Sequence, residues 1–147
     1  MQDIQLKSGN VLKFGLPPII DSIRLTNTVA KVFSNRGLEI KLDRDSELSF
    51  SALFDKNPDA FIKGLADIIF EEYIMELVLK CAEKCLYVCN GVSQKITLDT
   101  FDNEKNRADF YEVMIKIAIE NIRPFFGNLL TALQPTSELV RRESDQV

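Results

Sequence analysis

The chain has 147 residues, of which 46% are hydrophobic and 27% are charged, the balance of one ordinary globular domain with its own core. Its net charge of −4 and isoelectric point near 4.9 disfavour nucleic acid and anionic membranes as partners. The lack of histidine removes the commonest general base and the usual zinc ligand. The sequence shows neither a signal peptide nor an apolar run of about 18 residues, so we expect a cytosolic protein without membrane contact.

The N-terminal residues predict a β-hairpin over residues 3–14. Apolar and polar residues alternate on both sides of the turn sequence SGN at residues 8–10. Pro17 and Pro18 end the second strand and suit the first turn of a helix, where amide hydrogens lack partners in any case. Helical spacing then continues to about Asn35. The predicted stripe of this helix contains Ile19, Ile20, Ile23, Val29, Val32 and Phe33.

The central part of the chain predicts mostly helix. Residues 38–42 alternate, which fits either a short strand or an extended connector, and Ser46 is a candidate N-cap for a short helix. A second N-cap followed by proline at residues 57–58 begins the longest helical run, which extends to about Val88. Gly64 leaves open whether this run is one helix or two. Its predicted stripe contains Phe61, Ile62, Leu65, Ile68, Ile69, Tyr73, Leu77, Cys81 and Cys85.

The three cysteines, Cys81, Cys85 and Cys89, fall at i, i+4 and i+8 and are predicted to share one face of this helix. Neighbours on a regular helix rarely reach disulfide geometry, so we expect reduced thiols. A structural zinc site needs a fourth ligand and usually a closer spacing. Core packing is therefore the favoured interpretation, with metal or redox chemistry as the alternative.

The C-terminal third predicts two more helices. Asn90 and Gly91 stop the preceding helix, residues 96–98 form a short extended link, and Asp99 or Thr100 caps the next helix. Pro124 is expected to kink or end that helix. The clearest amphipathic pattern of the chain lies before this proline and contains Phe110, Val113, Met114, Ile117, Ala118, Ile119 and Ile122.

After Pro124, residues 125–133 predict a short, very apolar helix, and residues 135–147 predict a flexible polar tail. The domain proper is therefore expected to span residues 1–134. Because helical spacing dominates and alternation is clear only near the N-terminus, the predicted fold class is mainly α, a helical domain with one small N-terminal β-hairpin.

No group of residues predicts catalysis. The carboxylates at residues 71–72 and at Asp99, Asp102 and Glu104 fit a solvated helix face and a helix start. The glycines have no phosphate-binding spacing. We therefore expect no enzyme activity and no catalytic, cofactor-binding or metal-binding residues.

The apolar side chains near the C-terminus are the one candidate site, as a surface that binds a protein partner. The alternative is that this last helix completes the core, and the same choice applies to the other phenylalanines, among them Phe50, Phe54 and Phe61. The predicted partner-binding residues are Phe125, Phe126, Leu129, Leu130 and Leu133.

Several segments carry a family resemblance. They are the opening Ile-x-Leu-Lys-Ser-Gly hairpin, the helix end closing in Tyr-x-x-Asn-Gly, the Ile-Thr-x-Asp-Thr-Phe entry, and the Asp-Phe-Tyr-Glu-Val helix that ends in Asn-Ile-x-Pro-Phe. In this layout the chain resembles tail assembly chaperones of long-tailed, siphovirus-type bacteriophages over most of residues 1–130.

The resemblance implies a non-enzymatic viral protein, made in the host cytoplasm and absent from the finished virion. It implies two partners, the phage tape measure protein, which it coats, and the tail tube subunits, which it recruits. Self-association is a further interaction left open. The alternatives are a structural tail completion or connector protein and a small helical regulatory domain that binds other proteins.

Overall fold

The computed structural model describes the backbone of residues 1–35 and 58–146, and the side chains of residues 1–33, 35 and 59–125. The expectations for residues 38–42 and for a helix at Ser46 lie outside these ranges. Within them the chain forms four α-helices, one 3-10 helix and a four-stranded antiparallel sheet. In chain order the elements are β1 Gln2–Gln5, β2 Val11–Phe14, α1 Ile19–Asn35, α3 Pro58–Ile68, α4 Glu72–Cys81, β3 Leu86–Cys89, β4 Val92–Lys95, η1 Leu98–Phe101 and α5 Glu104–Gln146.

The sheet consists of two hairpins side by side, in the strand order β1-β2-β3-β4. The first hairpin confirms the prediction near the N-terminus, with Ile4 paired to Leu12. Leu12 lies opposite Tyr87 in β3, which joins the first hairpin to the second. The turn of the second hairpin is Asn90 and Gly91, whose φ angles are 52° and 78°. Positive φ at both central residues is what a two-residue type I′ turn requires.

The expectation of a mainly α fold with a single hairpin is wrong, because β3 and β4 make the fold mixed α+β. The helical run predicted to reach Val88 ends at Cys81, and residues 86–89 form a strand instead. A short apolar run cannot be assigned to helix or buried strand from its spacing alone. Gly91 therefore closes a hairpin and does not end a helix.

The long helical run predicted from residue 58 onward consists of two helices, α3 and α4, which are separated by residues 69–71. The break therefore does not fall at Gly64. Gly64 lies inside α3, where a Cβ atom would come within 2.9 Å of the Phe33 ring. The missing side chain therefore lets α3 approach α1 closely.

Four members of the predicted apolar stripes are exposed, contrary to expectation: Ile19, Ile20, Ile62 and Tyr73.

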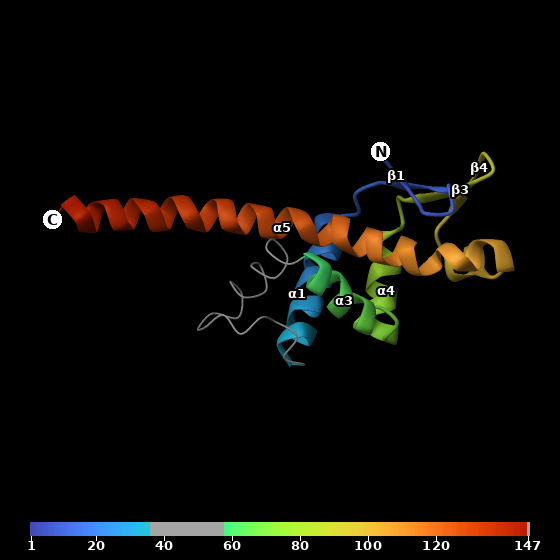
Figure 1. Cartoon of the computed structure of the whole chain (residues 1–147), viewed down its shortest axis with the longest axis horizontal. Helices are drawn as coiled ribbons and strands as arrows, with labels where there is room; N and C mark the ends of the chain where they lie inside the picture. The colour runs from blue at the N-terminus through green and yellow to red at the C-terminus, as the bar shows by residue number, and fades with distance from the viewer. Residues whose placement is uncertain (36–57, 147) are drawn as a thin grey trace.

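Helix α5 runs without interruption from Glu104 to Gln146, so Pro124 does not end it and residues 125–133 are not a separate helix. Proline removes one backbone hydrogen bond and crowds the preceding turn, but the hydrogen bonds of the other turns remain. The first half of α5 packs on α1 and α4, and Ile117 is fully buried there, as predicted. The C-terminal half projects past the other labelled elements (Figure 1). Flexibility of residues 135–147 stays a prediction.

Two caps precede α5, and only the first of them, around η1, uses one of the expected residues, Thr100. Thr97 and Thr100 form a capping box around η1. At the start of α5, the side chain of Asn103 accepts a hydrogen bond of 2.8 Å from the Asn106 amide. Asn103 therefore performs the N-cap function that the sequence had assigned to Asp99 or Thr100.

Candidate protein-interaction surfaces

The projecting half of α5 carries the residues predicted to bind a partner. Phe125 is half-buried at the point where the helix leaves the domain. Positions 126, 129, 130 and 133 follow on the described backbone of the same helix. Spacings of three and four residues place these positions on one side of an α-helix. The predicted positions thus lie on one continuous helix, and their role in binding a partner stays a prediction.

A buried hydrogen bond ties the base of α5 to α1, close to where the projecting half begins. Asn121 is buried, accepts a hydrogen bond of 2.7 Å from the Ser22 hydroxyl of α1, and donates one of 2.8 Å to the Ile117 carbonyl. Hydrogen bonds between buried polar groups favour one arrangement of the packed helices. The pair therefore ties α5 to α1 two residues before Arg123, where the helix becomes exposed.

A second buried polar cluster ties the first turn of the sheet to α5. The Asp109 carboxylate accepts hydrogen bonds through Oδ2 from Tyr87 at 2.6 Å, Asn10 at 2.8 Å and Ser8 at 2.9 Å. Burial alone would raise the pKa of Asp109, but these three hydrogen bonds outweigh it and lower the pKa. The same burial, with the carboxylate beside it, raises the pKa of Tyr87. Asp109 is thus a charged acceptor that holds the first hairpin on the helix.

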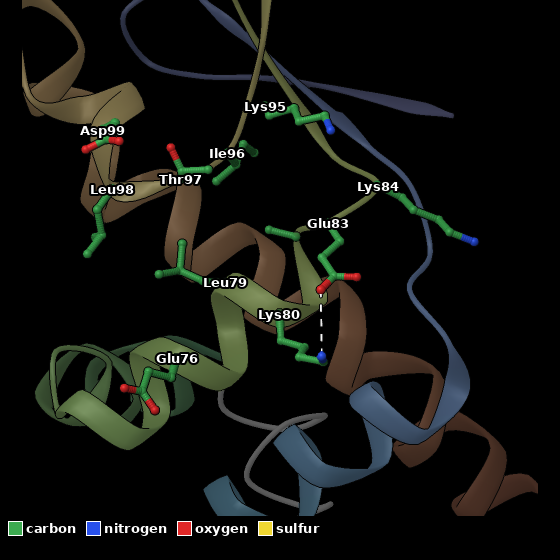
Figure 2. A pocket seen from close by; sticks show the side chains of 11 residues that line it. Glu76, Leu79, Lys80, Glu83, Lys84, Lys95, Ile96, Thr97, Leu98 and Asp99 are labelled. Carbon is green, nitrogen blue, oxygen red and sulfur yellow. Dashed lines mark ion pairs between the residues drawn. The ribbon is translucent and has the colours of Figure 1, made fainter.

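The other notable surface is a groove of about 750 Å³ between α4, the end of β4 and η1 (Figure 2). Leu79, Ile96 and Leu98 supply apolar surface, and Leu98 is 51% exposed. The groove is lined by Glu76, Leu79, Lys80, Ala82, Glu83, Lys84, Lys95, Ile96, Thr97, Leu98 and Asp99. The sequence does not predict this groove, because residues 96–98 indicate only an extended link between two elements.

Charges are divided across the groove. Lys84 and Lys95 lie on one side, while Glu76 and Asp99 lie on the other (Figure 2). Within the described part of the chain none of these four forms an ion pair, whereas Lys80 and Glu83 pair at 3.8 Å. Apolar surface between opposite charges suits a protein segment that carries charges of both signs. The groove is therefore a second candidate docking surface.

The cysteines do not share a helical face, contrary to prediction. Cys81 ends α4, Cys85 lies in the following loop and Cys89 ends β3. All three are free thiols, and Cys85 donates a weak hydrogen bond of 3.5 Å to the Gly15 carbonyl. Burial, with a smaller effect of the Asp21 charge, raises the pKa of Cys81 to about 12, so this thiol is not a nucleophile at neutral pH.

The predicted carboxylate groups do not assemble into a site. Asp102 pairs with Arg107 at 3.3 Å on the surface, Glu104 lies in the first turn of α5, and Asp99 lines the groove. In the described ranges, no group of three or more cysteine, aspartate or glutamate side chains could hold a metal ion.

No family model, curated protein or solved structure matches this chain. No helix among the described residues is long and apolar enough to span a membrane. The function is therefore inferred from the surfaces described above and from the resemblance carried by the sequence.

Proposed function

We propose that this protein is a phage tail assembly chaperone that binds the tape measure protein and helps recruit tail tube subunits, without catalysing a reaction. The observation that carries the proposal is that α5 is one continuous helix that extends beyond the rest of the domain. Its first half is anchored in the core, and its second half runs past the domain. The positions of Phe126, Leu129, Leu130 and Leu133 fall on one side of that second half.

A helix with one apolar side is suited to a helical partner. Recognition between amphipathic helices uses apolar anchors at i, i+3, i+4 and i+7, and the positions from 126 to 133 have this spacing. A tape measure protein is long, helical and apolar, so it offers many segments able to pack on such a side. The buried Ser22 and Asn121 contact supports the proposal because it holds the presenting helix in one direction.

Recruitment of tube subunits requires a surface that stays open when α5 is occupied. The groove beside Leu98 lies at the other end of the domain from the projecting half of α5 (Figures 1 and 2). Its opposite charges give it a preferred partner orientation. We assign the tape measure protein to α5 and the tube subunit to the groove.

The experiment is co-expression of the tape measure protein with the full chain or its variants. The wild-type chain should keep the tape measure protein soluble. The double variant Phe126→Ser with Leu130→Ser should fold with an unchanged melting temperature and leave the tape measure protein insoluble. The matched control, Leu98→Ser in the groove, should still keep it soluble.

Three outcomes count against the proposal. A double variant that is folded and still solubilises the tape measure protein places the site elsewhere, and a large loss of thermal stability shows that this part of α5 belongs to the core. Detection of the chain in purified virions by mass spectrometry, at a fixed ratio to the tube protein, supports the structural tail protein instead.

A further inference from the structure

We propose that the tail tube subunit binds this protein as an extended segment, which adds a strand to the free edge of β4 and places its side chains in the adjoining groove. The inference rests on the proposed function, because it concerns the groove assigned there to the tube subunit. It adds the conformation of the bound segment and its charge pattern, in which an apolar residue lies between an acidic and a basic one.

Strand β4 is an edge of the sheet, and its outer side has no backbone partner among the described residues. In a hairpin with a two-residue turn, the amide after the turn donates to the carbonyl before it, so Val92 bonds to β3. The direction of the N–H and C=O groups alternates along a strand. The backbone groups of Ser93 and Lys95 therefore face away from β3, where an added strand can bond to them.

A hydrogen bond at the end of β4 supports this register and limits the free edge. The Lys95 carbonyl accepts a hydrogen bond from the Thr100 hydroxyl, which lies outside the sheet. The Thr97 amide bonds to the same hydroxyl oxygen at 3.2 Å, so the chain beyond Lys95 is already capped. An added strand thus has the Ser93 amide, the Ser93 carbonyl and the Lys95 amide to pair with. Side chains must supply the rest of the affinity.

The groove begins where this free edge ends. Lys95 is the last residue of β4 and the first residue on this wall of the groove. The wall continues through Ile96 and Thr97 to Leu98, whose side chain is half exposed (Figure 2). A segment bonded to β4 therefore enters the groove with its next residues. In strand addition, backbone hydrogen bonds give affinity and pockets for alternate side chains give specificity.

The charges of the groove favour a different protein over a second copy of this chain. Lys84 and Asp99 lie on opposite sides, and within the described ranges neither forms an ion pair, so the best occupant carries both signs. A two-fold pairing of two β4 strands about Ser93 would bring Asn90 and Gly91 of the second copy beside the groove. Both residues are uncharged, so the charges of the groove would stay unpaired.

The first test is the affinity of the purified tail tube subunit for the full chain, measured by isothermal titration calorimetry. Ser93→Pro removes an amide that faces away from β3, so this variant should fold and bind about tenfold more weakly. The matched control is Gln5→Pro on β1, the other edge strand. The Leu6 amide bonds across the hairpin to Asn10, so the Gln5 amide faces outward, and this variant should bind like the wild type. Asp99→Lys should weaken binding about threefold by reversing one charge of the groove.

The second test uses the wild-type chain, so it decides the matter whether or not the proline variant folds. Amide exchange is followed by nuclear magnetic resonance in the free chain and in its complex with the tube subunit. The Ser93 and Lys95 amides should exchange about tenfold or more slowly in the complex. The amides of Val92 and Gln94, which already bond to β3, should change less.

Unchanged exchange at Ser93 and Lys95 in the complex overturns the inference. So does a folded Ser93→Pro variant that binds the tube subunit like the wild type, and loss of binding in Leu98→Ser would then indicate a helix docked in the groove. In both cases the tube subunit is still recruited, so the proposed function stands. A tube subunit that does not bind the wild-type chain overturns both proposals, whereas a tape measure protein left insoluble by the wild-type chain counts only against the proposed function.

Discussion

The Tyr87 hydroxyl donates a hydrogen bond of 2.6 Å to Oδ2 of Asp109, and this contact joins β3 to α5 inside the protein. Because Asn10 donates to both the Tyr87 oxygen and the same carboxylate, the first hairpin depends on the pair as well. The position of α5 relative to the sheet is therefore set by a small group of polar atoms in addition to apolar packing.

Replacing Asp109 with alanine should lower the free energy of unfolding by about 2–4 kcal/mol, because the Tyr87 and Asn10 donors lose their acceptor in a buried site. Urea unfolding followed by circular dichroism measures the change. The control is Asp102→Ala, which removes an exposed ion pair with Arg107 and should cost less than about 0.5 kcal/mol. Equal losses of unfolding free energy in the two variants would show that the hydrogen bonds around Asp109 do not stabilise the fold.

The stabilisation by Asp109 should depend on pH. Its pKa in the folded protein lies below the ordinary value of 3.8, so the stabilisation is complete above about pH 4 and is lost as the pH falls through the folded pKa. The difference in unfolding free energy between wild type and Asp109→Asn should therefore be constant from pH 7 to 5 and shrink toward pH 3. A difference that stays constant or grows on acidification would show that the carboxylate charge is not stabilised in the fold.

Ile117→Asp should unfold the protein, because Ile117 is fully buried in α5. Burying an unpaired carboxylate costs several kcal/mol, comparable with the roughly 5–15 kcal/mol that stabilises a whole domain. Tyr111→Asp, at an exposed position of the same helix, should remain folded. Circular dichroism and thermal melting distinguish the two variants, and a soluble Ile117→Asp protein with normal melting would contradict the packing described.

Gly91→Ala should destabilise the protein by about 1 kcal/mol through the backbone alone. Gly91 has a φ of 78°, and a Cβ atom there would meet nothing within 4 Å, so no steric clash contributes. Asn90→Gly should change the stability by only a few tenths of a kcal/mol, because glycine also adopts positive φ. Denaturant titration measures the free energy of unfolding of the two variants and of the wild type. An unchanged Gly91→Ala variant would argue against the type I′ turn.

The spacing of apolar residues in the sequence correctly predicted the long helices and the hairpin in which apolar and polar residues alternate. The first hairpin, α1 and the first half of α5 were predictable because their apolar residues repeat over enough positions to define a period. Strand β3 was not predictable from period alone, since Cys81, Cys85 and Cys89 continue the helical spacing through its four residues. The Asn90 and Gly91 pair was the available signal for a hairpin, and it also fits a helix end.

The candidate surfaces were predictable only in part. The helical spacing of positions 126–133 is visible in the sequence, but Pro124 indicated a break where the structure has a continuous helix. The groove beside Leu98 and the cluster around Asp109 join segments far apart in the chain, such as Ser8 and Asp109. No local pattern encodes such contacts, because they depend on how the hairpins pack against α5.

Hydrogen–deuterium exchange of the full chain, alone and in complex with the tape measure protein, tests the central claim most directly. The claim is that the partner binds the projecting half of α5. We expect the amides of residues 126–140 to exchange more slowly in the complex, with those of residues 95–99 in the groove unchanged. Slower exchange in residues 95–99 with no change in residues 126–140 would contradict the assignment.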